Sequence, residues 1–425
     1  MRIIESSNRR GIKRLVNRRQ EVDPNLARRV ARIVATVRGS GDEALLRYAQ
    51  RFDQLAQPVE VSHQEMQAGL RSITPDLRAA LRTSATHIRR IAKRQLPRNW
   101  RATVTPGVEI EQRVTPLHRV GCYVPAGRYP LPSSLLMTAV PATVAGVPEV
   151  IVVCPHPDPT ILAAAAIAGA TRVFRLGGAH AIAALAYGTA TIPKVDKIVG
   201  PGNAYVATAK ALVSSDCPID FYAGPTEIVI LTTTGNPDWI AADLIAQAEH
   251  DPDARSIVVT PDRDLAARIA QRVRDRLPAQ GPARASIRRH GTVVIVASID
   301  EAVELVDQIA PEHLVCDRND VARRTTRAGT VFIGPYGAQA AGDYASGSNH
   351  VLPTGGAARF RGGLGAFDFV HIHSAQRISR NGLKALAPTI VSLAEAEGLT
   401  AHAESVRVRM TRTKSGGGLQ TRQGS

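Results

Sequence analysis

The chain has 425 residues, of which 44% are hydrophobic and 4% aromatic. This length is enough for two or more packed domains, and the scarcity of aromatic residues means that aliphatic side chains must build the cores. Because the chain has no run of roughly 18 apolar residues and no apolar N-terminal segment, we expect no membrane span and no secretory signal, and we predict a cytoplasmic protein.

The formal net charge of +16 is high, and Arg and Lys cluster in residues 9–29 and again in residues 89–94. A nucleic-acid surface is one explanation of such clusters. No nucleic-acid-binding motif accompanies them, however, and the basic pairs recur at helical spacing among apolar residues, as in LARRVARIVATV. We therefore favour solvated helix faces and predict no nucleic-acid partner.

The cysteines are widely separated and form no CxxC pair, which argues against a thiolate metal site or a disulfide framework. We expect all four to be small buried hydrophobic residues. They are Cys122, Cys154, Cys217 and Cys316.

Residues 1 to about 95 have a mostly helical pattern. From about residue 105, short β-branched runs such as EVIVVC and TEIVILT alternate with alanine-rich helical stretches. This alternation predicts an α/β fold with two doubly wound, Rossmann-like parallel sheets. Beyond about residue 365 we expect the strands to stop. The helical segment that follows is too small to hold a core alone, so we expect it to pack on its own chain or on a partner subunit.

These patterns predict two α/β domains with small terminal extensions. The predicted parts are an N-terminal helical extension (1–20), a first, discontinuous domain (21–122 with 230–365), a second domain (123–229), a C-terminal helical segment (366–412) and a disordered tail (413–425).

Gln247-Ala248-Glu249-His250 ends a predicted helix. Gln247 and His250 are three residues apart, so their side chains project from one face and can converge on one ion. A polar helix end that faces solvent is the alternative interpretation.

The dipeptide Glu312-His313 lies between a predicted helix and a short predicted strand. An adjacent acid and imidazole suit proton transfer, because His titrates near neutrality. Such dipeptides are also common on protein surfaces, so the pair alone is weak evidence.

Two further segments carry groups that can bind a metal. Asp343 and His350 lie in a long polar loop over residues 342–354, and such loops are usually functional. Glu397 and His402 lie five apart in the C-terminal segment. Oxygen and nitrogen donors without sulfur suit zinc, and manganese or cobalt would fit the same donors. The candidate donors are Gln247, His250, Asp343 and His402.

A glycine turn at residues 199–205 joins a predicted strand to a predicted helix, which aims backbone N–H groups at a phosphate or ribose. Residues 177–180 make a second strand-to-helix turn, and the turn at 123–127 is suited to line the same cleft. These turns indicate a nucleotide cofactor, although none of them is a GxGxxG motif.

The motifs together resemble those of the histidinol dehydrogenase family, in the family's order from about Gly41 to His402. They are VGCYVPAGRYPLPSSLLMTAVPATVAGV, KIVGPGNAYVATAK, IDFYAGPTEIVI, DLIAQAEHDPDA, APEHL, AGDYASGSNHVLPTGG and GLTAH. The resemblance is specific, because many independent motifs agree.

The resemblance implies an enzyme that oxidises L-histidinol through L-histidinal to L-histidine in histidine biosynthesis, with one zinc ion per subunit and two NAD molecules reduced in turn. It implies a homodimer whose C-terminal segment completes the partner's site. The implied zinc ligands are Gln247, His250, Asp343 and His402, and the implied proton-transfer pair is Glu312 and His313. NAD would contact Tyr123, His180 and Asn203. The substrate would contact Thr226, His350 and Glu397, together with the zinc ligands and His313.

The chain departs from the family's pattern at three places. His180 replaces a usual Gln beside the implied NAD site, Ala126-Gly127 replaces two glycines, and His371-Ile372 replaces a basic pair. Two rival functions remain: a sister enzyme on the same scaffold that oxidises another small polar alcohol, such as a sulfonated diol, and a basic nucleic-acid-binding protein without catalysis. The substrate-facing Thr226, Glu397 and His402 favour histidinol.

Overall fold

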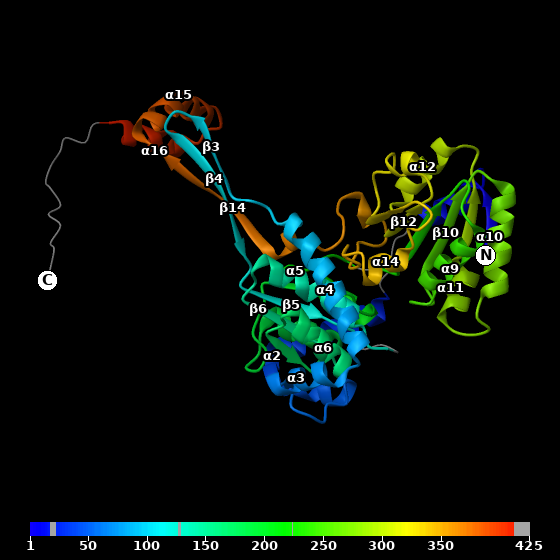
Figure 1. Cartoon of the computed structure of the whole chain (residues 1–425). Coiled ribbons are helices and arrows are strands. Elements are labelled where there is room, and N and C mark those ends of the chain that lie inside the picture. Colours follow the sequence, from blue (N-terminus) through cyan, green and yellow to red (C-terminus); the bar gives the residue numbers. More distant parts are fainter. Residues whose placement is uncertain (18–22, 126–128, 223, 412–425) are drawn as a thin grey trace. The chain divides into compact units, whose positions relative to one another are not determined.

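The computed structural model describes residues 1–17, 23–125, 129–222 and 224–411 and divides into two compact units (Figure 1). The larger unit combines Met1–Leu96 with Pro116–Phe369, and the smaller unit combines Pro97–Thr115 with the residues from Val370 onward. In the described ranges no helix is long and apolar enough to cross a membrane. The predicted tail at 413–425 lies outside those ranges.

The first sheet of the larger unit has six parallel strands in the order β1-β11-β10-β9-β12-β13. Its strands are β1 (Arg2–Glu5), β9 (Glu227–Leu231), β10 (Arg255–Thr260), β11 (Thr292–Ile295), β12 (His313–Cys316) and β13 (Thr330–Ile333). The helices between and beside them are α1 (Arg9–Val16), α9 (Pro237–Ala248), α10 (Arg263–Arg276), α11 (Pro282–His290), α12 (Ile299–Ile309), α13 (Asn319–Ala322) and α14 (Gln339–Tyr344). The chain runs outward from β9 to β11 and returns to β12 beside β9, so the strand order reverses between β9 and β12.

Strand β9 is anchored on both faces, because successive residues of a strand point to opposite sides of the sheet. Ile228 and Ile230 pack in the core with α9 and α10, whereas Val229 and Leu231 pack in the core with α12. All four side chains are at most 2% exposed. Burial of an aliphatic side chain of this size contributes about 2 kcal/mol. The residues immediately before and after β9 are therefore held firmly in place.

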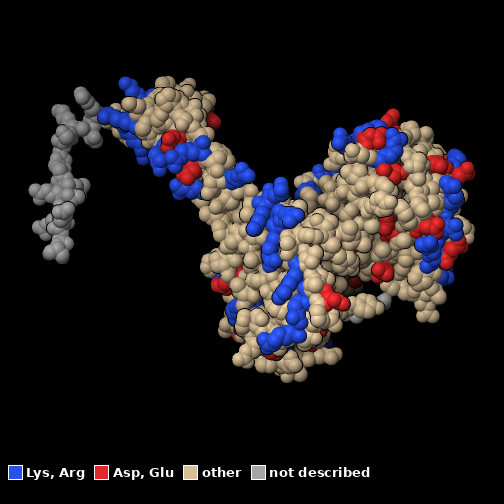
Figure 2. Space-filling view, in the orientation of Figure 1, with Lys and Arg blue, Asp and Glu red and all other residues tan. Residues whose placement is uncertain are grey.

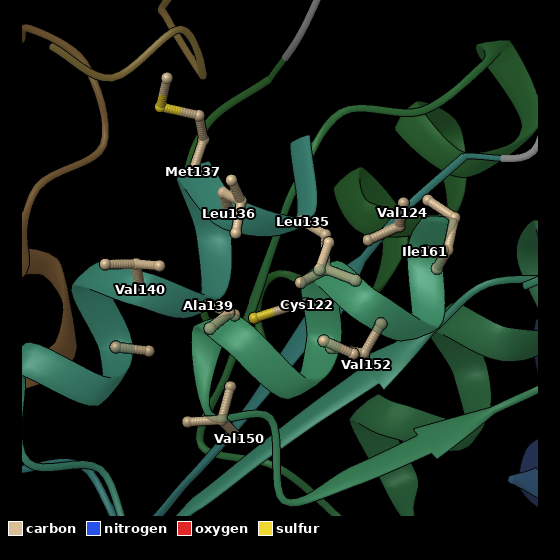
Figure 3. Close-up of a cluster of buried hydrophobic side chains, with 14 of the residues drawn as sticks. Cys122, Val124, Leu135, Leu136, Met137, Ala139, Val140, Val150, Val152 and Ile161 are labelled. Atoms are coloured by element: carbon tan, nitrogen blue, oxygen red, sulfur yellow. The ribbon is translucent and has the colours of Figure 1, made fainter. Parts of the chain in front are cut away.

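The second sheet has five strands in the order β2-β7-β6-β5-β8, of which β2 alone is antiparallel to its neighbour. Its strands are β2 (Glu60–Val61), β5 (Arg119–Tyr123), β6 (Glu149–Val153), β7 (Arg172–Phe174) and β8 (Lys197–Val199). Its helices are α2 (Pro24–Phe52), α3 (His63–Ser72), α4 (Pro75–Gln95), α5 (Pro132–Ala145), α6 (Pro159–Ala168), α7 (Gly178–Tyr187) and α8 (Ala204–Val213). Figure 3 shows the largely aliphatic core on one face of this sheet, where side chains of α5 and α6 cover those of β5 and β6. The first, parallel sheet and the second, largely parallel sheet confirm the predicted α/β class.

The smaller unit contains a three-stranded sheet in the order β14-β4-β3 and two helices. Its elements are β3 (Trp100–Thr105), β4 (Val108–Pro116), β14 (Val370–Ile378), α15 (Arg380–Ala396) and α16 (Thr400–Met410). Two short 3-10 helices, Ala357–Arg359 and Ala366–Phe369, precede β14 in the larger unit.

The packing of the N-terminal helices differs from the predicted domain division. Residues 21–122 were assigned to the domain with 230–365, but α2, α3 and α4 pack on α7, α6 and α5 of the second sheet. Strand β5, which crosses the predicted boundary at residue 122, pairs with β6 and β8 in the middle of that sheet. Gly69 lets α3 approach α6 closely, because a Cβ atom at this position would lie only 2.6 Å from the Cβ of Leu162 on α6.

Two predicted helical regions contain strands. Arg2–Glu5 in the predicted N-terminal extension pairs with β11, so β1 closes one edge of the first sheet. Val370–Ile378, in the region where strands were expected to stop, forms β14. Both predictions were wrong. Strand β1 has only four residues, which is too short for a clear strand pattern, and in β14 the residues His, Ser, Gln and Arg interrupt the apolar pattern.

Part of the positive charge lies on α4, and Figure 2 shows Lys and Arg side chains gathered along this helix. The basic residues of α4 are Arg78, Arg82, Arg89, Arg90, Lys93 and Arg94. The opposite face of the helix is buried through Leu81, Ala85 and Ile88. The helix therefore has the one-sided pattern of a solvated helix face, as the spacing of its residues predicts.

Candidate active site

Glu312 and His313 lie at the amino end of β12 and are both buried. The Glu312 carboxylate accepts hydrogen bonds from the Thr226 hydroxyl at 2.5 Å and from the Glu227 backbone N–H at 2.9 Å. Burial, together with the nearby charge of Asp343, raises the pKa of Glu312 well above its usual range. The carboxyl group therefore binds a proton more readily than a surface glutamate.

The His313 ring is oriented by a backbone carbonyl. Its Nδ1 lies 3.3 Å from the carbonyl oxygen of Glu227, which can only accept, so the neutral ring carries its proton on Nδ1. Burial lowers the pKa of His313 to about 4, which keeps the imidazole neutral near pH 7. Its Nε2 therefore has a free lone pair, 3.8 Å from Oδ1 of Asp343, and can accept a proton.

Asp343 and His350 come together at α14 and the loop that follows it. The amide of Gln339, one helical turn earlier, donates to the Asp343 carboxylate. His350 Nδ1 donates to the Asp343 carbonyl at 3.0 Å, and its Nε2 lies 3.3 Å from the Ser134 hydroxyl. Burial lowers the pKa of His350, so this ring is also neutral near pH 7.

Gln247 lies in the last turn of α9, and His250 follows two residues after the helix ends at Ala248, rather than on the predicted helical face. The Gln247 amide donates to the Thr226 hydroxyl at 2.5 Å, which links Gln247 through Thr226 to Glu312. The Gln247 amide oxygen is buried and has no hydrogen-bond partner among the described residues. The exposed His250 ring directs Nδ1 at the carbonyl oxygens of Ala246 (3.2 Å) and Gln247 (3.3 Å), which leaves Nε2 for a ligand.

The predicted metal ligands are divided between the two units. Gln247, His250 and Asp343 belong to the larger unit, whereas His402 belongs to the smaller one, where it is exposed on α16. Glu397, at the end of α15, is also exposed in the smaller unit. Within the described ranges no three His, Cys, Asp or Glu side chains form a group that could hold a metal ion. Of these residue types, the larger unit contributes only His250 and Asp343 to the predicted set, and Gln247 adds a buried amide oxygen that has no partner among the described residues.

The predicted NAD-contacting residues line one cavity of about 600 Å³ at the carboxyl ends of the second sheet's strands. Tyr123 ends β5 and accepts a hydrogen bond at its hydroxyl from the Gly178 N–H at 3.0 Å. Asn203 caps α8, whose first N–H groups donate to its side chain. The strand order reverses between β5 and β8 beside this cavity, which is where doubly wound sheets bind ligands.

His180 is fixed inside this cavity by residues that no motif indicated. Its Nε2 lies 2.8 Å from Oδ2 of Asp53, at the end of α2. The rings of Tyr48 and Phe52, one helical turn apart, stack with centroids 5.7 Å apart, and both lie about as far from the His180 ring, at 6.1 and 6.2 Å. His180, which replaces the family's usual Gln, therefore has a local partner in Asp53.

The same cavity is lined by Arg29, Arg32 and Arg51. The Arg51 guanidinium lies 5.3 Å from the Phe52 ring centroid. The spacing of Tyr48 and Phe52 could have indicated that both rings line one side of this cavity, because residues four apart share a helix face. The sequence has no signal that brings Asp53 to His180, 127 residues away.

The remaining sequence expectations have mixed outcomes. All four cysteines are buried and free, as predicted. His371 and His373 stack with centroids 5.2 Å apart on β14, and nothing in the structure explains the replacement of the family's basic pair there. The Ala126-Gly127 departure lies outside the described residues.

Comparisons with known proteins agree with this architecture. The family model for histidinol dehydrogenase matches residues 16–410. The chain is 45% identical to a histidinol dehydrogenase of Geobacter metallireducens over 411 residues, covering 93% of this chain and 94% of the relative. It is 44% identical to one of Methanothermobacter thermautotrophicus over 425 residues, covering 96% and 99%.

A solved structure is also similar over almost its whole length. The crystal structure of histidinol dehydrogenase from Elizabethkingia anophelis superimposes with a TM-score of 0.91 at 32% identity, covering 96% of this chain and 98% of that one. The chain therefore belongs to the histidinol dehydrogenase family.

Proposed function

We propose that this protein oxidises L-histidinol through L-histidinal to L-histidine, with reduction of two NAD molecules, as a step of histidine biosynthesis. Membership of the family supports the reaction. The observation that carries the proposal is the buried Glu312–His313 pair, whose carboxylate is linked through Thr226 to Gln247. An imidazole and a carboxyl group side by side supply two proton acceptors, one for each half of the reaction.

NAD would bind in the cavity that Tyr123, His180 and Asn203 line. The stacked Tyr48 and Phe52 rings offer an aromatic face. The arginines that line the same cavity supply positive charge for the coenzyme's pyrophosphate.

One zinc ion per subunit would be held by Gln247, His250 and Asp343 together with His402. The buried, unpartnered oxygen of Gln247 supports this donor set, since such an atom normally has a partner. When bound, the ion would orient the substrate and polarise its carbinol oxygen.

His402 and Glu397 would reach the site from the partner subunit of a homodimer. Both are exposed in a unit that is separate from the one holding the other three ligands. The substrate would also contact Thr226 and His350. The Thr226 hydroxyl donates to the Glu312 carboxylate, and the His350 ring donates to the backbone carbonyl of Asp343, so each lies next to a residue of the proposed site.

The geometry of the pair supports the following assignment of the proton transfers. In the first half, Nε2 of His313 would accept the hydroxyl proton of histidinol and then release it to solvent, and the first NAD would supply the hydride acceptor. In the second half, Glu312 removes a proton from the water that adds to the aldehyde. His313, once it has lost its first proton to solvent, would accept the remaining hydroxyl proton of the hydrate, and a second NAD would supply the hydride acceptor, which leaves the carboxylate.

Substitution of His313 by Asn tests this assignment. The variant should lose both the oxidation of L-histidinol and that of L-histidinal supplied directly, measured as NADH formation. Glu312→Gln should retain the first oxidation better than the second. An undiminished aldehyde oxidation by His313→Asn would overturn the assignment, and activity toward a sulfonated diol but not L-histidinol would overturn the substrate.

A further inference from the structure

A second cavity, of about 620 Å³, lies at the carboxyl end of the first sheet, and none of its lining residues is proposed above to bind substrate or coenzyme. Its lining residues lie within or just after β9 and β12, follow β13, or belong to α9. Glu312 and His313 are at the amino end of β12, so this cavity is at the other end of the same strand. The strand order reverses between β9 and β12, and in doubly wound sheets such a reversal opens a crevice at the carboxyl edge.

The rim of this cavity is built by hydrogen bonds around Asp317, the residue after β12. Its Oδ2 accepts from the Thr232 hydroxyl at 2.8 Å and from the N–H groups of Thr233 and Thr234 at 2.9 Å each. These hydrogen bonds fix the start of the turn that connects β9 to α9. The floor is apolar, formed by Ile230 and Val315 of the two neighbouring strands. A rim fixed in this way means that the cavity is formed before a ligand arrives.

Two aromatic rings meet at the cavity. Trp239 of α9 is 49% exposed and Tyr336, in the turn after β13, is 86% exposed. Their centroids are 5.9 Å apart with an interplanar angle of 37°. Large aromatic faces left this exposed beside an apolar floor are suited to a flat or cationic ligand.

The charge of the cavity is negative in a chain whose net charge is +16. Asp243 and Asp317 line it, and no Lys or Arg does so among the described residues. The Asp243 carboxylate is half-buried on α9, and in the described part of the chain it has no hydrogen-bond or ion-pair partner. Burial alone raises the pKa of Asp243 to about 6, so the group is still ionised at pH 7 and lacks a counter-ion. These two carboxylates disfavour the binding of an anion here, including a nucleotide phosphate.

We propose that this cavity binds a small aromatic amine, with its ring against Trp239 and Tyr336 and its ammonium group at the Asp243 carboxylate. An ammonium ion compensates a half-buried carboxylate and interacts favourably with aromatic faces, so both features of the cavity favour the same ligand class. The proposal does not depend on the dehydrogenase activity, because none of these residues belongs to the proposed active site.

The chain has two tryptophans, so Trp100→Phe leaves Trp239 as the single tryptophan reporter. In this variant, phenethylamine should change the tryptophan fluorescence in a saturable way. The neutral analogue 2-phenylethanol should bind about tenfold more weakly, and phenylacetate should produce no saturable change, because only the amine pairs with Asp243. Equal affinity for the amine and the alcohol, or no saturable change with any of the three compounds, would overturn the proposal.

Asp243→Asn in the same background should remove the preference for the amine while NADH formation from L-histidinol is unchanged. If the preference persists in this variant, the carboxylate is not the binding group and the proposal fails. Tyr336→Ala is a second variant that cannot disturb the core, because the side chain is 86% exposed. It should weaken binding of both the amine and the alcohol, and unchanged binding of both would contradict the assigned ring contact.

Discussion

Replacing Thr226 by Val tests the polar chain that joins Gln247 to Glu312. The Thr226 hydroxyl accepts from the Gln247 amide and donates to the Glu312 carboxylate, each at 2.5 Å. Valine has nearly the same shape but no hydroxyl. The substitution therefore leaves a buried amide N–H without its acceptor and a buried carboxyl group with one donor fewer.

The magnitude follows from the burial of the two partners. A lost hydrogen bond whose partner stays buried costs roughly 1–3 kcal/mol. Thr226 itself is half-buried, and Glu312 keeps the Glu227 N–H at 2.9 Å, so water and that donor offset part of the loss. We expect the free energy of unfolding to fall by about 2–4 kcal/mol in total. The pKa of Glu312 should rise further, because the hydrogen bond from Thr226 opposes the effect of burial.

Urea unfolding of the metal-free protein at neutral pH measures this loss. Thr226→Ser is the matched control, since it keeps the hydroxyl and removes one methyl group, and it should cost about 1 kcal/mol. Zinc binding should weaken about tenfold in Thr226→Val but not in Thr226→Ser, because only the valine releases the Gln247 amide. If Thr226→Val unfolds at the same urea concentration as Thr226→Ser, the hydrogen-bonded chain carries no stability and the reasoning is refuted.

Three further predictions concern the base, the coenzyme cavity and the dimer. In metal-free protein, the wild type should lose about 3 kcal/mol more unfolding free energy than His313→Asn as the pH falls from 7 to 4, because the folded-state pKa of His313 is about 4 rather than 6.5. Equal losses in urea titrations of both proteins would contradict this. Arg51→Gln should raise the KM for NAD about tenfold with little change in kcat, since a cation facing the pyrophosphate is lost; a fall in kcat at constant KM would count against that placement. Inactive Gln247→Ala and His402→Ala proteins, unfolded together and refolded, should regain roughly a quarter of wild-type activity if each site uses residues of both subunits. No recovery in a confirmed mixed dimer would place His402 in its own subunit's site.

The sheets could be predicted because their strands are continuous β-branched runs. Glu149–Val153 and Glu227–Leu231 are buried almost throughout, so their apolar character is unbroken in the sequence. Strand β14 could not be predicted in the same way, because its residues are mostly exposed and polar. The helices at residues 24–95 could be recognised as helices, but their sheet could not be identified, since an amphipathic face fits any apolar surface.

The candidate site could be predicted in part. Glu312, His313 and Asp343 were singled out and lie together, as do Tyr123, His180 and Asn203. The supporting residues were missed, because Gln339 resembles any helical glutamine until the fold places it beside a carboxylate. His402 and Glu397 lie in the smaller unit, and their proposed place at the partner's site could not be derived from the pattern of one chain.

The number of NADH molecules formed per molecule of L-histidinol tests the central claim most directly. It should be measured on the purified protein as prepared, after treatment with a chelator, and again after zinc is returned. We predict two NADH per L-histidinol, lost with the chelator and restored by zinc. A single NADH per L-histidinol, or no NAD reduction by a folded, zinc-loaded dimer, would contradict the proposed function.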